Sequence, residues 1–231
     1  MRSNSKMPHA NRVRWGGLAG ILAGAMAIVL APLATTAAVY KAWAGGWGRP
    51  PRGWVAAVGS TLGPLLAFAT PPKVYQTYGR AFFFVFLFLV FALRGLHAHG
   101  GAAGGRPERY GFRIAFASLL LLLVANVGDY WLGEEILGHR LWGATFTVTL
   151  LGLLLLLIAS VLLGAAALRS AALPRWSAWA LMIAFPMGVV LSFWGVRHIP
   201  SAPMLPLGIA WGLAGYSLWD EVKQGLRSIA A

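Results

Sequence analysis

Long apolar runs alternate with short polar stretches along the whole chain. The longest run, residues 142–168, contains 27 residues without a charged side chain. A helix needs about 20 consecutive apolar residues to cross a hydrocarbon core of about 30 Å. The pattern therefore predicts an all-α, polytopic integral membrane protein, with a single membrane domain that covers residues 1–231.

The apolar runs predict six transmembrane helices joined mostly by short connections. Their expected positions are about 13–39, 81–97, 112–132, 142–168, 176–196 and 203–219. Residues 41–80 interrupt the pattern with Gly-Gly, Pro-Pro and isolated basic residues. Within them, segment 54–70 is apolar but has only 17 residues and contains Gly59, Gly63 and Pro64, so length alone does not show whether it crosses.

The distribution of Lys and Arg distinguishes the two topologies, because cytoplasmic loops carry an excess of cations. If segment 54–70 does not cross, 12 cations are cytoplasmic and 7 lie outside; if it crosses, the numbers become 8 and 11. The count favours six spans with both termini cytoplasmic, in the inner (plasma) membrane. Segment 54–70 is then a re-entrant or interfacial helix on the outer face.

Composition agrees with a membrane protein and removes several other classes. The chain is 58% hydrophobic and 11% charged, whereas roughly a quarter of a soluble domain is charged. The net charge of +13 does not predict nucleic-acid binding, because the cations lie between apolar runs. The absence of cysteine excludes disulfides, thiolate metal sites and iron–sulfur clusters.

A polar turn, residues 125–140, separates the two most apolar runs and holds three of the six acidic residues. If residues 134–139 continue as a helical turn, Glu135 and His139 share one face. With His198 from the next outer loop they form a candidate site for a divalent metal of the zinc type. The alternative interpretation is a solvated loop anchored by flanking tryptophans.

Four other charged residues at this face are candidates for ion or partner contact: Asp129, Glu134, Arg140 and Arg197. Asp129 is expected at the membrane interface, paired with Arg140 or Arg197, although an ionisable residue at a span end is also a candidate for a proton or ion role. No predicted span carries a histidine in its interior, so bis-histidine haem is not expected and no cofactor is predicted.

Small residues recur at helical spacing in the first and last spans. Gly16, Gly20 and Gly24 lie on one face of the first span, and Gly208 and Gly212 on one face of the last. Such faces let helix backbones approach closely in lipid, where packing drives association. We expect these glycines to mediate helix packing.

These features leave three function classes open. The leading hypothesis is a non-catalytic protein acting by helix association, as an accessory subunit of a membrane complex or a self-assembling homo-oligomer. The alternative is a small transporter or channel with an acidic outer vestibule, and the third is a lipid-acting enzyme, although no catalytic motif is present. Expected partners are the lipid bilayer, other membrane subunits and anionic headgroups, the last attracted by the basic segment 41–80, which we expect to fold over the 125–140 turn.

Overall fold

The computed structural model describes residues 7–46, 50–100, 105–193 and 201–230, without the side chains of residues 7–10, 134, 135, 139, 193 and 225–230. All regular structure within these residues is helical, which confirms the predicted class. Six long helices run along the molecule: α1 (Met7–Ala44), α4 (Pro71–Gly100), α5 (Gly105–Asn126), α6 (Gly133–Ser170), α7 (Arg175–Phe193) and α8 (Met204–Ala230). The shorter elements are α2 (Gly53–Thr61), α3 (Gly63–Leu66) and the π-helical turn η2 (Val127–Leu132).

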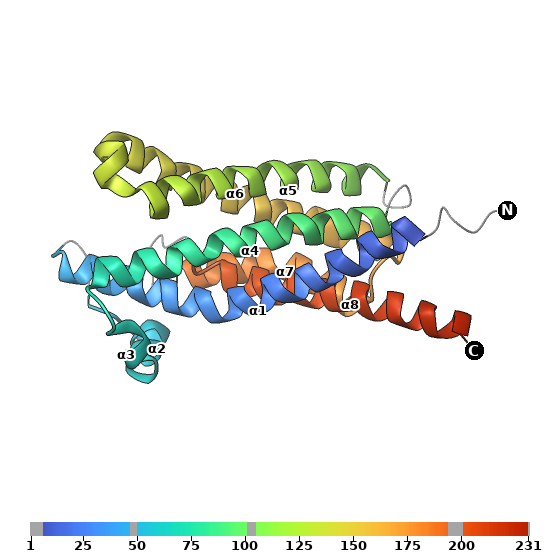
Figure 1. Cartoon of the computed structure of the whole chain (residues 1–231), viewed down its shortest axis with the longest axis horizontal. Helices are drawn as coiled ribbons and strands as arrows, with labels where there is room; N and C mark the ends of the chain where they lie inside the picture. The colour runs from blue at the N-terminus through green and yellow to red at the C-terminus, as the bar shows by residue number, and fades with distance from the viewer. Residues whose placement is uncertain (1–6, 47–49, 101–104, 194–200, 231) are drawn as a thin grey trace.

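The six long helices form an elongated bundle around one apolar core (Figure 1). Helix α1 packs between α4 and α8, while α5, α6 and α7 complete the circuit from α4 back to α8. Leu93, Leu119 and Trp211 are among the side chains fully buried in the core. Helix α1 begins and α8 ends at the same end of the bundle, so the two helices are antiparallel.

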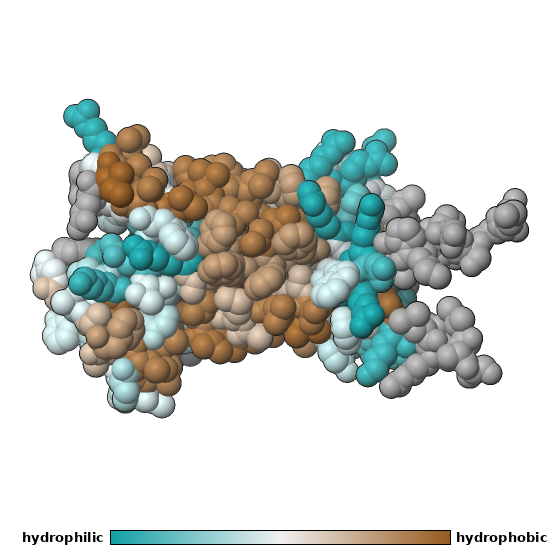
Figure 2. Space-filling model, viewed as in Figure 1, coloured by the Kyte–Doolittle hydropathy of each residue, from teal (hydrophilic) through white to brown (hydrophobic). Residues whose placement is uncertain are grey.

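Five helical segments are long and apolar enough to cross a membrane: Asn11–Ala44, Pro71–Gly100, Gly105–Leu132, Arg140–Ser170 and Arg175–Ser192. Helix α8, which carries Asp220 and Glu221, is not among them. Figure 2 shows a hydrophobic belt across the middle of the molecule, with polar surfaces at both ends. These features are typical of a multi-pass membrane protein.

Helix α4 begins ten residues earlier than the predicted second span. Two prolines, Pro71 and Pro72, open it, and proline is favoured in a first helical turn because its backbone angle is already helical and its missing N–H has no partner there. The additional turns carry Tyr75, Gly79 and Arg80 along the outer part of the bundle. This extension positions the candidate site described below.

Helices α2 and α3 replace the predicted single helix at 54–70. With nine and four residues, each is too short to cross a bilayer. Val55 of α2 is buried in a small cluster with Ala202, and the Tyr78 hydroxyl of α4 donates a 2.6 Å hydrogen bond to the Leu65 carbonyl. Both short helices lie on the far side of α1 and α4 from η2 (Figure 1), so the middle of segment 41–80 does not fold over the 125–140 turn as predicted. The ends of the segment do reach the turn, since Arg80 donates a hydrogen bond to the Tyr130 carbonyl and Lys41 acts electrostatically on Asp129.

The predicted small-residue faces of α1 and α8 pack against each other, except that Gly16 faces Gly95 of α4 and Gly17 takes its place. We call this contact the glycine seam; its members are Gly17, Gly20 and Gly24 of α1 and Gly208, Gly212 and Gly215 of α8. A Cβ added at Gly24 would lie 2.6 Å from both the Gly208 carbonyl oxygen and the Gly212 Cα. The two faces are therefore occupied within the chain.

Candidate functional site

The polar turn between the two central helices contains a π-helical segment, η2, directly after α5. π-Helical turns are rare and occur frequently at functional sites, because the extra residue changes the direction of the side chains around it. Here η2 carries Asp129 and Tyr130, which are only 3% and 8% exposed. The Asp129 carboxylate is buried beside residues of α4, α6 and the end of α1, while its predicted location at the membrane interface stays a prediction.

Polar side chains from several helices meet at this turn. We call them the Asp129 cluster: Lys41 of α1, Tyr75 of α4, Asn126 of α5, and Asp129 and Tyr130 of η2. The two tyrosine hydroxyl oxygens are 3.0 Å apart and share a hydrogen bond. The amide nitrogen of Asn126 donates a 2.9 Å hydrogen bond to the Gly79 carbonyl. These bonds connect α4 to the end of α5.

Two glycines let the helices approach closely enough to form the cluster. The Tyr130 ring lies directly over Gly79, where an added Cβ would overlap the ring carbons. Gly128 lies against Thr145 of α6, whose Cγ2 would be 2.6 Å from an added Cβ. Arg80 strengthens the first contact, since its Nε donates a 2.8 Å hydrogen bond to the Tyr130 carbonyl.

Three acceptor oxygens in the cluster are buried without a hydrogen bond of good geometry to any described group: Asn126 Oδ1 and both carboxylate oxygens of Asp129. The Trp142 indole is nevertheless near enough to Asp129 for a weaker polar interaction. A buried polar group left unsatisfied costs about 1–3 kcal/mol. A hydrogen bond weakens steeply with misalignment, so this contact with Trp142 does not satisfy the carboxylate. The arrangement is therefore not optimised for stability.

Lys41 supplies the positive charge that acts on Asp129. Its Nζ lies 4.5 Å from the centre of the Tyr75 ring and 5.5 Å from that of Trp142, so the ammonium also interacts with two aromatic faces. An ionisable residue at membrane depth usually pairs with another and marks an ion or proton site. The cluster has this form.

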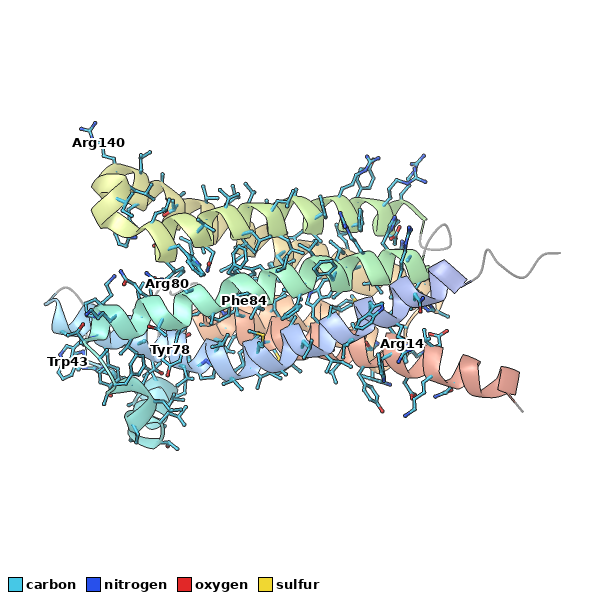
Figure 3. All side chains as sticks on the ribbon, viewed as in Figure 1. Arg14, Trp43, Tyr78, Arg80, Phe84 and Arg140 are labelled. Atoms are coloured by element: carbon cyan, nitrogen blue, oxygen red, sulfur yellow. The ribbon has the colours of Figure 1, made fainter. Side chains whose placement is uncertain are left out.

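The predicted ion-pair partners of Asp129 are elsewhere. Arg140 is exposed and points away from the bundle (Figure 3), so the expected Asp129–Arg140 pair is absent from the described residues and Lys41 takes its place. Arg197 lies outside the described residues. The side chain of Glu134 is also outside the description, and its predicted role in ion or partner contact stays a prediction.

The predicted metal site of Glu135, His139 and His198 cannot be assembled from described side chains, since all three lie outside the description. The backbone nevertheless tests the assumption that residues 134–139 continue as one helical turn. Gly138 has φ 72° and ψ 160°, which breaks the helix between Glu135 and His139, so these residues do not share a face of one continuous helix. Among the residues that are described, no group of three or more metal-ligating side chains occurs.

Sequence reasoning missed Lys41, Tyr75 and Tyr130 as members of one site. It placed Lys41 and Tyr75 in the segment 41–80 and Tyr130 in the polar turn 125–140, without connecting them. One signal was available: Lys41 is a cation on the side predicted to be outside, against the usual bias. A buried counter-charge is a physical reason for such a cation.

Comparisons with known proteins identify no relative, because no protein-family model, curated protein or solved structure matches the chain. The function therefore has to be argued from the geometry of the chain itself. That geometry places its most unusual chemistry at η2, where a carboxylate and an amide oxygen are buried in a membrane protein without full hydrogen bonding.

Proposed function

We propose that the protein is a small membrane transporter or channel for a proton or a monovalent cation, with Asp129 as the ion-binding carboxylate. The observation that carries the proposal is the buried carboxylate whose oxygens, with Asn126 Oδ1, lack hydrogen-bond donors of good geometry. Oxygen acceptors of this kind are the ligands that hard cations prefer. A protonated carboxyl would satisfy the same atoms by becoming a donor.

Lys41 gives the site a way to exchange charge. In the ion-free state its ammonium compensates the carboxylate of Asp129, as the electrostatic attraction between them indicates. When a proton or cation binds Asp129, Lys41 loses that partner but keeps the aromatic faces of Tyr75 and Trp142. Lys41 can therefore stay in place while the charge on Asp129 changes.

The proposed topology has six spans, with α8 as the sixth and both termini cytoplasmic in the plasma membrane. Its support is the cation count together with the antiparallel placement of α1 and α8 (Figure 1). Helices α2 and α3 then form an interfacial excursion on the outer side. Reporter fusions at Gly100 and Gly138 test this topology: it requires a cytoplasmic signal at Gly100 and an external signal at Gly138.

The remainder of the bundle favours a second candidate, the non-catalytic accessory subunit or homo-oligomer. Buried hydroxyls of Ser118 and Thr149 donate to carbonyls of their own helices at 2.8 and 3.0 Å, so they offer no hydrated path of the kind a channel uses. An associating protein can be dry throughout. The glycine seam does not add to this candidate, because its faces are occupied within the chain.

Ion flux into proteoliposomes separates the two candidates. Purified protein is reconstituted into vesicles loaded with a dye that reports the ion under test, and an inward gradient of protons, Na⁺ or K⁺ is applied. The transport proposal requires flux above that of protein-free vesicles for at least one ion, and its loss in Asp129→Asn.

The matched control is Asp220→Asn, which removes the same charge from α8, where Asp220 accepts a 2.7 Å hydrogen bond from Gln224. This variant should keep wild-type flux. Wild-type vesicles that are no more permeable than empty ones to all three ions would contradict the transport proposal. A stable oligomer in mild detergent would then support the second candidate.

A further inference from the structure

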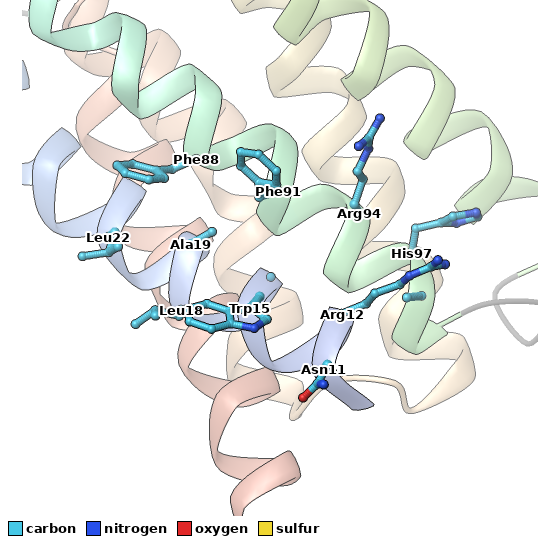
Figure 4. Close-up of a pocket in the computed structure, with 12 residues that line it drawn as sticks. Asn11, Arg12, Trp15, Leu18, Ala19, Leu22, Phe88, Phe91, Arg94 and His97 are labelled. Carbon is cyan, nitrogen blue, oxygen red and sulfur yellow. The ribbon is translucent and has the colours of Figure 1, made fainter. Parts of the chain in front are cut away.

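A groove of about 960 Å³ opens between α1 and α4 at the end of the bundle where α1 begins, remote from the Asp129 cluster. Figure 4 shows its two kinds of lining. Arg12 and Arg94 lie at the polar end. Side chains of Trp15, Leu22, Phe88 and Phe91 line the remainder.

We propose that this groove binds one anionic phospholipid, with the phosphate at Arg12 and Arg94 and one acyl chain along the aromatic floor. The occupant is a lipid because the groove has two arginines at one end and apolar side chains along the remainder, and it lies at the edge of the hydrophobic belt. A soluble anion would use only the arginines, and a neutral apolar ligand only the floor.

Charge complementarity selects an anionic headgroup. The three described carboxylates near this end already have partners: Glu108 contacts the His97 Nδ1 at 2.5 Å, Glu221 contacts the His99 Nε2 at 3.1 Å, and Asp220 accepts a 2.7 Å hydrogen bond from Gln224. In the described part of the chain Arg12 and Arg94 form no ion pair, and Arg94 lies 5.7 Å from the Phe116 ring centre. Both guanidinium groups are exposed and line the groove, so each is available for a charge-assisted hydrogen bond to a phosphate, Arg94 from the side that faces α5 (Figure 4).

The shape of the groove follows from the sequence. Gly16 and Gly95 bring α1 and α4 into backbone contact, which closes the floor beneath the arginines. One helical turn further along α1, the small side chain of Ala19 leaves a hollow between Trp15, Leu22 and the phenylalanines of α4. The predicted cytoplasmic location of this end agrees with an anionic ligand, since anionic lipids are concentrated in the cytoplasmic leaflet.

Native mass spectrometry of the full chain tests the proposal. Detergent-solubilised protein is titrated with phosphatidylglycerol or phosphatidylcholine, and the fraction carrying one bound lipid is measured. The expected result is a preference for phosphatidylglycerol that falls about fivefold for each arginine removed in Arg12→Ala and Arg94→Ala, the change that corresponds to about 1 kcal/mol per basic side chain. The matched control, Arg52→Ala with Arg140→Ala, removes two charges from the opposite end and should leave the preference unchanged.

A groove-filling variant distinguishes a built site from surface charge alone. Ala19→Leu keeps both arginines but occupies the hollow, so the fraction of protein that carries one lipid should fall. In a separate titration of the wild type, free inorganic phosphate should not displace the bound lipid. The proposal is overturned if the wild type binds phosphatidylglycerol and phosphatidylcholine equally. It is also overturned if the variant with both Arg12→Ala and Arg94→Ala keeps the wild-type preference for phosphatidylglycerol. Since Arg12 and Arg94 are exposed, their variants should fold and keep the test decisive even if Ala19→Leu does not.

Discussion

The glycine seam and the Asp129 cluster are two helix contacts of the same bundle with opposite chemistry. In the seam, α1 and α8 meet backbone to backbone, and a Cβ at Gly20 would lie 2.9 Å from Gly215 Cα. In the cluster, α1, α4, α5 and η2 meet through tyrosines, an amide and a charged pair, and three acceptor oxygens remain unsatisfied. The seam is filled by close packing within the chain, whereas the cluster retains acceptor oxygens without hydrogen-bond donors of good geometry.

This difference separates stability from function. In lipid, helix association depends on close packing and interhelical hydrogen bonds, because no hydrophobic term favours it. The seam uses packing fully, so substitutions there should damage the fold. The cluster retains polar groups that cost stability, so substitutions of its charged members should change activity more than the fold.

The largest effect should come from Gly24→Leu in the glycine seam. Its side chain would collide with the backbone of Gly208 and Gly212, and overpacking a filled contact costs about 1–3 kcal/mol or more. Little monodisperse protein should be recovered by size-exclusion chromatography in detergent. Gly143→Leu is the control, since nothing lies within 4 Å of its added Cβ; equal yields of the two variants would refute the seam's role.

An asymmetric effect should follow removal of either charge in the cluster. Lys41→Met leaves the buried carboxylate of Asp129 without its cation, at a cost of about 1–3 kcal/mol. Asp129→Asn should change stability by less than about 1 kcal/mol, because Lys41 is only partly buried and keeps two aromatic contacts. Thermal unfolding in detergent measures both. A larger loss in Asp129→Asn would mean that the pair is mainly structural.

A smaller effect is expected for Gly79→Ala, which pushes the Tyr130 ring from its position over α4. The cost should be about 1–2 kcal/mol, because a ring can shift where a backbone cannot. Gly63→Ala has open space around its Cβ and provides the control. Unchanged unfolding temperature and flux in Gly79→Ala would show that the close approach of Tyr130 is not required.

The smallest effect should come from Tyr75→Phe, which removes one hydroxyl from the 3.0 Å contact with Tyr130. A single neutral hydrogen bond contributes about 1 kcal/mol net. Tyr110→Phe alters an exposed tyrosine, 57% accessible, and should be silent. A double-mutant cycle of Tyr75→Phe with Tyr130→Phe isolates the pair; zero coupling energy would show that the two hydroxyls act independently.

The hydrophobic pattern predicted the long helices because the length of an apolar run can be read directly from the sequence. It could not set the start of α4, where prolines extend the helix beyond the apolar run, and it could not predict the break at Gly138, which depends on a positive φ. It also identified small-residue faces on α1 and α8 without indicating that the two pack together, since pairing depends on the arrangement of all six helices.

The candidate site was only partly predictable for a related reason. Asp129 was recognised as a polar residue at a span end, but its burial depends on a π-helical turn and on Gly79 and Gly128, which bring neighbouring helices close. Hydropathy carries no information about such local widening. Lys41 is more than eighty residues from Asp129 in the chain, so no local pattern connects them.

Infrared difference spectroscopy of the carboxyl groups tests the central claim, that Asp129 is an exchangeable ion-binding carboxylate in the membrane. The spectrum is recorded in nanodiscs before and after acidification, and again after addition of Na⁺ or K⁺. We expect a protonated-carboxyl band that responds to pH or to a cation in the wild type, disappears in Asp129→Asn and persists in Asp220→Asn. Identical difference spectra for wild type and Asp129→Asn under all conditions would contradict the account.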